Sequence, residues 1–130
     1  MFLSRLALPE KLAFYSLAHA VAAAQSDISA VEEALLDAAL GEMALATPPA
    51  LQDIQTACSA ISSATARRVV LLELLMIALI DGDIVEAELA IVCQVAELLG
   101  LQVELKRARD WATAMLTVYR SGERFISSPA

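Results

Sequence analysis

Carboxylates are concentrated in one short stretch, Asp81-Gly82-Asp83-Ile84-Val85-Glu86-Ala87-Glu88. This stretch follows an apolar run at 69–80 and precedes a second helical pattern. Gly adopts backbone conformations that other residues avoid, and Asp bonds nearby backbone groups, so a sharp turn between two helices is expected. Hard divalent cations such as calcium or magnesium prefer oxygen ligands, so the turn is a candidate metal site. Its candidate ligands are Asp81, Asp83, Glu86 and Glu88.

The order Asp-Gly-x-Ile-x-x-x-Glu resembles the second half of an EF-hand loop. In that loop the Gly permits the sharp turn and the final Glu coordinates calcium with both oxygens. Gly82 and Glu88 occupy the matching positions, but the first and third ligand positions fall on Ile77 and Leu79. These two residues carry no carboxylate, so a standard EF-hand is not expected. A purely structural alternative is that Asp83 and Glu88 stabilise a helix N-terminus, where negative charge is favourable.

The acidic turn has a weaker copy near the start of the chain. A shift of 56 residues places 25–32 on 81–88, and the Asp, the Ile and the final Glu coincide. The first copy lacks the Gly, but Asp27 and Glu32 remain as candidate ligands. Ser29 and Glu32 also form a capping box, in which each side chain satisfies a backbone N–H at the helix start. The first copy therefore has a structural explanation that needs no ligand.

Helical periodicity accounts for most of the chain. The expected helices cover 9–25, 29–44, 50–61, 64–80, 85–99 and 103–120. The fourth is apolar on nearly every side, which is typical of a central helix. The breaks between helices include Pro48-Pro49, Gly100 and Ser121-Gly122. The sequence thus predicts an all-α, single compact bundle of about six helices with two helix–acidic turn–helix units. The domain spans 9–120, with an N-terminal extension at 1–8 and a flexible tail at 121–130.

Composition and charge narrow the possible partners. The 130-residue chain is 58% hydrophobic, above the ~45–50% of ordinary soluble domains. This excess could fill a dense core, or it could leave an apolar face that binds a partner or a second copy of the chain. A net charge of −7 argues against nucleic acids and anionic membrane surfaces. We expect Arg67-Arg68 and Lys106-Arg107-Arg109 to be solvated or ion-paired. No apolar run reaches the ~20 residues of a membrane span, so direct insertion is not expected.

Other reactive residues favour a non-enzymatic protein. His19 is the single histidine and is expected to pack or lie at the surface, and no nucleophile motif or phosphate-binding loop is present. Cys58 and Cys93 lack metal-type spacing and are read as buried, reduced thiols of a cytoplasmic protein, although they could meet in space. Glu73 interrupts the apolar run. It could face the acidic turn, pair with an arginine such as Arg67 or Arg107, or reach solvent.

Three features together resemble the TerB-like family, which is associated with tellurite resistance. They are the apolar helix, the Asp-Gly-x-Ile-x-x-x-Glu turn and a following helix that ends in Leu98-Leu99-Gly100-Leu101. The weaker first unit fits that family's paired-helix layout, so the resemblance covers about residues 9–120. It implies an all-α, cytoplasmic bacterial domain without known catalysis. It also implies that the protein binds divalent metal through acidic residues and acts together with membrane-associated stress-response partners. The best matches to the acidic motif are Asp81, Asp83 and Glu88, and Asp27 and Glu32 match less fully.

Two functions of different kinds follow. The first is a cation-responsive binding or scaffold module that uses Asp81, Asp83 and Glu88, with Glu86 or Glu73 as further ligands. The second is a metal-independent interaction module that forms homo-oligomers or joins a membrane-linked protein complex through its excess apolar surface.

Overall fold

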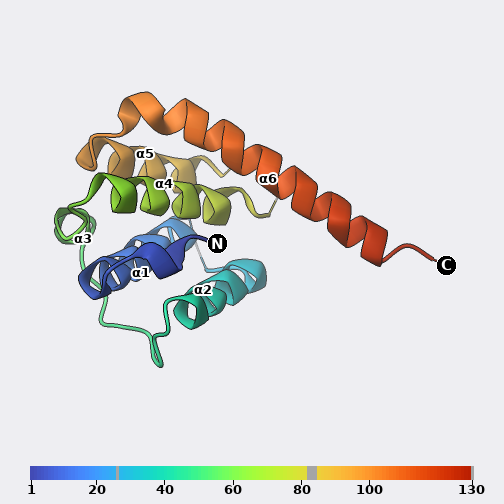
Figure 1. Ribbon diagram of the computed structural model, residues 1–130, viewed down its shortest axis with the longest axis horizontal. Helices are drawn as coiled ribbons and strands as arrows, with labels where there is room; N and C mark the ends of the chain where they lie inside the picture. The colour runs from blue at the N-terminus through green and yellow to red at the C-terminus, as the bar shows by residue number, and fades with distance from the viewer. Residues whose placement is uncertain (26, 82–84, 130) are drawn as a thin grey trace.

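The computed structural model describes residues 1–25, 27–81 and 85–129, and within these ranges all regular structure is helical (Figure 1). The predicted all-α bundle of six helices is confirmed. The helices are α1 (Leu8–Ala22), α2 (Ala30–Glu42), α3 (Ile54–Ser59), α4 (Ala64–Leu79), α5 (Glu86–Leu98) and α6 (Leu105–Ile126), with short 3-10 turns η1 (Leu3–Arg5) and η2 (Gln102–Glu104).

Helix α4 lies at the centre of the bundle. It contacts α1, α5, α6 and η1, and Figure 1 shows it between the α1–α2 pair and the α5–α6 pair. Its side chains are buried on several faces, including Val70, Leu71, Leu74 and Leu75. A helix that is apolar all round can bury its side chains only when other helices surround it. The central position predicted for this segment is therefore confirmed.

Side-chain caps set the starts of three helices. Ser29, Asp53 and Ser63 each accept the backbone N–H of the residue three positions later. The predicted capping box is also present, because the Glu32 carboxylate accepts the Ser29 N–H at 3.1 Å. Helix α3 begins later than expected because Asp53 caps it. The preceding Gln52 instead donates its backbone N–H to the Ser16 hydroxyl at 2.8 Å.

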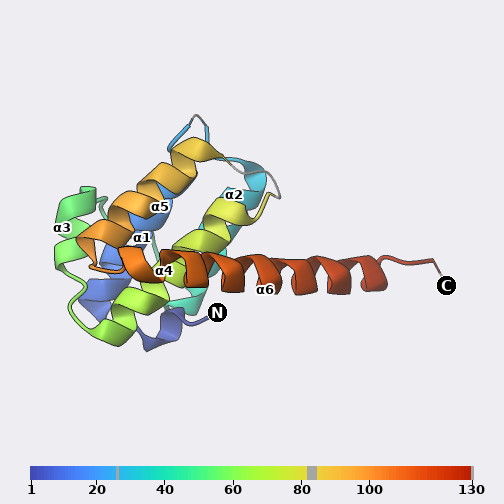
Figure 2. The same cartoon turned by 90° about the horizontal axis from the view of Figure 1, so that it is seen from above.

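The last helix extends further than the sequence suggested. The predicted end at Ser121-Gly122 is wrong, since α6 continues to Ile126. Figure 2 shows its C-terminal half projecting past the other helices. Ala112 and Leu116 are its buried residues, whereas Val118 is 67% exposed. None of the described helices combines the length and the apolar composition that a bilayer crossing requires.

Substitution of individual glycines tests the helix boundaries. Gly100 has a φ of +72° after α5, so Gly100→Ala should lower the free energy of unfolding by about 1 kcal/mol.

Gly122 lies inside α6, where a Cβ would meet no described atom within 4 Å. Gly122→Ala should therefore increase helical circular dichroism and cost no stability, because Ala favours helix by about 1 kcal/mol over Gly.

Gly41→Ala within α2 is the matched control, since a Cβ at Gly41 is equally unobstructed among the described atoms. Urea unfolding followed by circular dichroism measures all three variants. A loss of helix in Gly122→Ala, with a normal Gly41→Ala, would contradict the continuation of α6.

Candidate carboxyl-pair site

The final glutamates of the two repeated motifs meet inside the bundle. Glu32 lies in the first turn of α2 and Glu88 in the first turn of α5. They are 4% and 5% exposed, and their carboxyl groups lie close enough for each to influence the other. Two carboxyl groups can hydrogen-bond only when one of them carries a proton and acts as the donor. The repeat therefore places two equivalent acidic side chains at one buried junction.

The surroundings favour a protonated Glu88. Burial is the largest cause, followed by the hydrogen bond to Glu32 and the negative charges of Glu32 and Asp81, and together these raise the pKa of Glu88 to about 8. Burial disfavours the charged form of a carboxyl, and a neighbouring carboxylate acts in the same direction. Burial and the neighbouring carboxyl therefore favour retention of a proton on Glu88 at neutral pH.

Each carboxyl retains a buried oxygen that receives no hydrogen bond from a conventional donor in the described chain. These atoms are Glu32 Oε2 and Glu88 Oε1. Buried polar atoms are usually paired, because an unpaired one loses its hydration without compensation. A shared proton supplies one such contact, and a cation bound between the carboxyls would supply another. The pair thus has unused acceptor capacity in a dry environment.

Asp81 lies at the exposed edge of this junction. The Ser29 hydroxyl donates to its carboxylate at 3.4 Å and accepts the Glu32 backbone N–H at 3.1 Å. Ser29 therefore connects the start of α2 with the turn that follows α4. Through this serine, the acidic turns of the two units become neighbours although they are far apart in sequence.

The other predicted ligands divide into two groups. Asp27 and Glu86 are exposed, and no described hydrogen bond or ion pair joins either to the carboxyl pair. Asp83 lies outside the described residues. Across the residues that are described, no three His, Cys, Asp or Glu side chains are grouped as a metal site requires. The described site is therefore a pair, Glu32 and Glu88, with Asp81 at its edge.

Glu73 has a role that the sequence did not indicate. Its carboxylate accepts the Phe2 backbone N–H at 2.7 Å and lies 2.9 Å from the N-terminal ammonium. Neither predicted arginine pairs with it. Arg67 donates to the Ile61 carbonyl, and Arg107 pairs with Glu104. Glu73 therefore anchors the first residues of the chain, and a long-range backbone contact of this kind leaves no pattern in the sequence.

The cysteine prediction holds for one residue only. Cys58 is buried, and burial raises the pKa of its thiol to about 11. Cys93 is exposed, so its predicted burial is wrong, and both thiols are free. His19 is half-buried, with its ring 6.5 Å from that of Tyr15, which agrees with the expected packing role.

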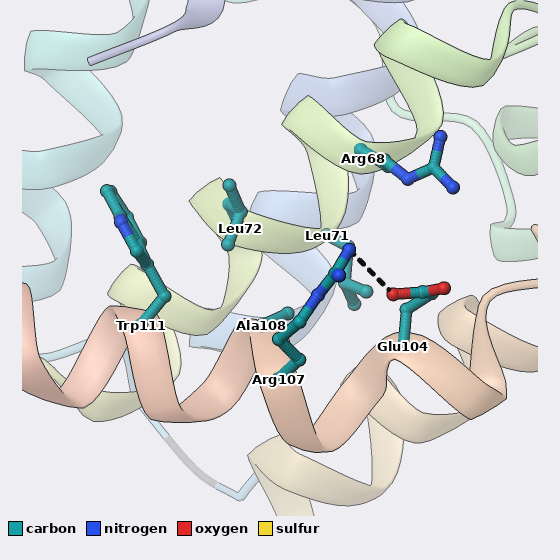
Figure 3. A pocket seen from close by; sticks show the side chains of 7 residues that line it. All are labelled: Arg68, Leu71, Leu72, Glu104, Arg107, Ala108 and Trp111. Carbon is teal, nitrogen blue, oxygen red and sulfur yellow. Dashed lines mark ion pairs between the residues drawn. The ribbon is translucent and has the colours of Figure 1, made fainter.

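The two predicted basic clusters meet at a pocket of about 260 Å³ between α4 and α6 (Figure 3). Arg68 comes from α4, whereas Arg107 comes from α6 and forms a 2.9 Å ion pair with Glu104. Leu71 and Leu72 form part of its apolar lining. Arg107 is thus ion-paired, as the sequence suggested. The surface is mixed in charge and differs from the buried carboxyl pair.

Searches of known protein families, characterised proteins and solved structures find no match to this chain. The TerB-like resemblance therefore rests on the residues that carry it, namely the acidic turn, its weaker copy and the segment Leu98-Leu99-Gly100-Leu101.

The carboxyl pair should make stability depend on pH. The ordinary pKa of Glu is 4.5 and that of folded Glu88 is about 8, so the folded protein holds a proton that the unfolded chain releases between these values. The contribution of Glu88 to the free energy of unfolding is fully present below about pH 4.5 and is lost as the pH rises to about 8. Each unit of pKa difference is worth about 1.4 kcal/mol, so the Tm should fall by several degrees.

Glu88→Gln keeps a neutral donor beside Glu32 and should remove this part of the pH dependence, leaving the variant more stable than the wild type at pH 8.5. Glu86→Gln is the control, because it removes an exposed carboxylate from the same helical turn. Thermal unfolding between pH 5 and 9 provides the comparison. Parallel curves for wild type and Glu88→Gln would show that the pair is not protonated.

Proposed function

We propose that this chain is a non-enzymatic, TerB-like binding or scaffold module that responds to divalent cations through Glu32 and Glu88. One observation carries the proposal. The equivalent glutamates of the two units are buried against each other and retain unpartnered oxygens. Carboxylates in this arrangement repel unless a positive charge lies between them. A proton supplies that charge in the absence of metal, and a cation can replace it.

The available ligand chemistry favours a hard cation. Glu32 and Glu88 provide buried oxygens, and Asp81 provides another at the exposed edge. Calcium and magnesium take oxygen ligands, and magnesium keeps several waters when a protein provides few carboxylates. A cation would have to displace the proton of Glu88, so its apparent affinity should rise with pH. Asp83 of the same turn is a further candidate that lies outside the described residues.

The cellular setting follows from the resemblance alone. It suggests a cytoplasmic module of a bacterial stress response of the tellurite type, with a membrane-associated protein complex as partner. The competing proposal is a metal-independent helical interaction module. The exposed apolar surface of α2, α4 and α6 favours this alternative, which needs no contribution from Glu32 or Glu88.

Thermal unfolding with added cations tests the proposal. After chelation, calcium, magnesium, manganese or zinc is added to wild type and to Glu32→Gln/Glu88→Gln. A cation at a hundred times its dissociation constant adds about 2.7 kcal/mol, which is a Tm rise of several degrees. We expect this rise in the wild type, larger at pH 8.5 than at pH 6, and its loss in the double variant.

Glu33→Gln/Glu97→Gln is the matched control. It removes one carboxyl group from each of the same two helices, α2 and α5, at exposed positions, so it should retain the cation response. A response that the control also loses would reflect net charge and not a site. If no cation raises the Tm of the wild type, the cation-responsive proposal fails and the metal-independent module takes its place.

A further inference from the structure

Large apolar side chains cluster on one surface of the described chain. The exposed members are Met1, Val31, Val118, Tyr119, Phe125 and Ile126. Contiguous apolar patches of this kind are unusual on monomers and commonly mark interaction sites. The surface has two parts, one convex and one concave.

The convex part is a stripe on the projecting half of α6. Val118, Tyr119, Phe125 and Ile126 recur at helical spacing and share one side of the helix. Phe125 is 82% exposed and Ile126 78%. Figures 1 and 2 both show this end of α6 extending away from the bundle. The projecting half of α6 is short, and a short helical segment without packing contacts is marginal in water, so a covering partner would stabilise it.

The concave part is a groove of about 570 Å³ that α2, α4 and α6 form together. Its lining is almost entirely apolar, including Val31, Leu35, Met76, Ile80 and Met115. Val118 and Tyr119 belong to both the groove and the α6 stripe. The groove and the stripe are therefore one continuous surface that offers both a helix ridge and a place to receive one.

We infer that this surface pairs two copies of the chain, with the α6 stripe of each copy seated in the groove of the other. A two-fold interface requires one patch to contain complementary parts, so that each contact occurs twice. The stripe and the groove satisfy that requirement. The apolar area that these side chains expose is on the order of 700 Å² per copy, close to the roughly 800 Å² per partner of a stable interface.

Other occupants fit less well. A bilayer is flat on this scale and cannot fill a groove, and the net charge of −7 opposes an anionic surface. The projecting half of α6 carries two arginines. Arg120 is already committed to the Leu79 and Ile80 carbonyls at 3.1 and 2.9 Å. The pairing surface contains neither Glu32 nor Glu88, so the pairing does not require cation binding.

Sedimentation equilibrium of the full chain tests the pairing, from low micromolar to near-millimolar concentration. We expect wild type to form dimers, and Phe125→Ser/Ile126→Ser to weaken association about tenfold or more, since two large apolar side chains lose their burial. Both residues are mostly exposed in one copy, so the variant should match the helical circular dichroism and Tm of the wild type at concentrations where the wild type is monomeric. Leu8→Ser/Val103→Ser removes two exposed apolar side chains elsewhere and should still dimerise.

A cysteine pair tests how the copies dock. In a Cys93→Ser background, Val31→Cys/Ile126→Cys should form disulfide-linked dimers on mild oxidation, whereas Val103→Cys in that background should not. A wild type that remains monomeric at every concentration overturns the inference. So does a dimer that is insensitive to Phe125→Ser/Ile126→Ser or gives no cross-link. Binding of monomers to phosphatidylcholine or phosphatidylglycerol vesicles through the stripe would assign the surface to a membrane and also overturn it.

Discussion

The burial of α4 is the constraint on which the rest of the structure depends. A segment that is apolar on nearly every side must be covered by neighbours, and α1, α5 and α6 provide that cover. The helix also needs its terminal backbone groups satisfied. Ser63 caps its start, and Arg120 of α6 donates to the Leu79 and Ile80 carbonyls at its end. These contacts fix the turn after α4, where Asp81 lies, beside the start of α2. The position of the acidic junction is therefore a consequence of core packing.

The repeat gives that junction its chemistry. Each unit places a glutamate in the first turn of its second helix, where negative charge is favourable. Taken singly, Glu32 is explained by its capping box and Glu88 by the helix terminus. The assembled bundle buries the two side chains against each other. Each carboxylate by itself stabilises the start of its own helix, but the two together disfavour the charged form of Glu88. A proton on Glu88 relieves the repulsion between the two carboxyls, which neither glutamate would experience in isolation.

Local signals explain what could be predicted from the sequence. Ser29, Ser63 and Gly100 act through neighbouring backbone, so the caps and helix ends near them were predictable. Both candidate glutamates were identified because they follow a repeated motif, but their mutual burial depends on how the units pack. Residues whose roles depend on distant contacts were missed. Glu73 meets the first residues of the chain, and Cys93 faces outward from a helix whose other side is buried. The end of α6 was misplaced because Gly122, a usual helix terminator, lies where no other described part of the chain forces a turn.

The carboxyl pair and the apolar groove use adjacent residues on two elements. On α2, Val31 lines the groove and Glu32 belongs to the pair. At the end of α4, Ile80 lines the groove and Asp81 lies at the edge of the pair. The carboxyl pair and the groove therefore share the start of α2 and the end of α4. Two binding events that share such elements influence each other reciprocally, because each can favour only the arrangement that it binds better. Occupancy of the pair would influence docking at the groove to the extent that it shifts the start of α2 relative to the end of α4, which the hydrogen bond from Ser29 to Asp81 connects.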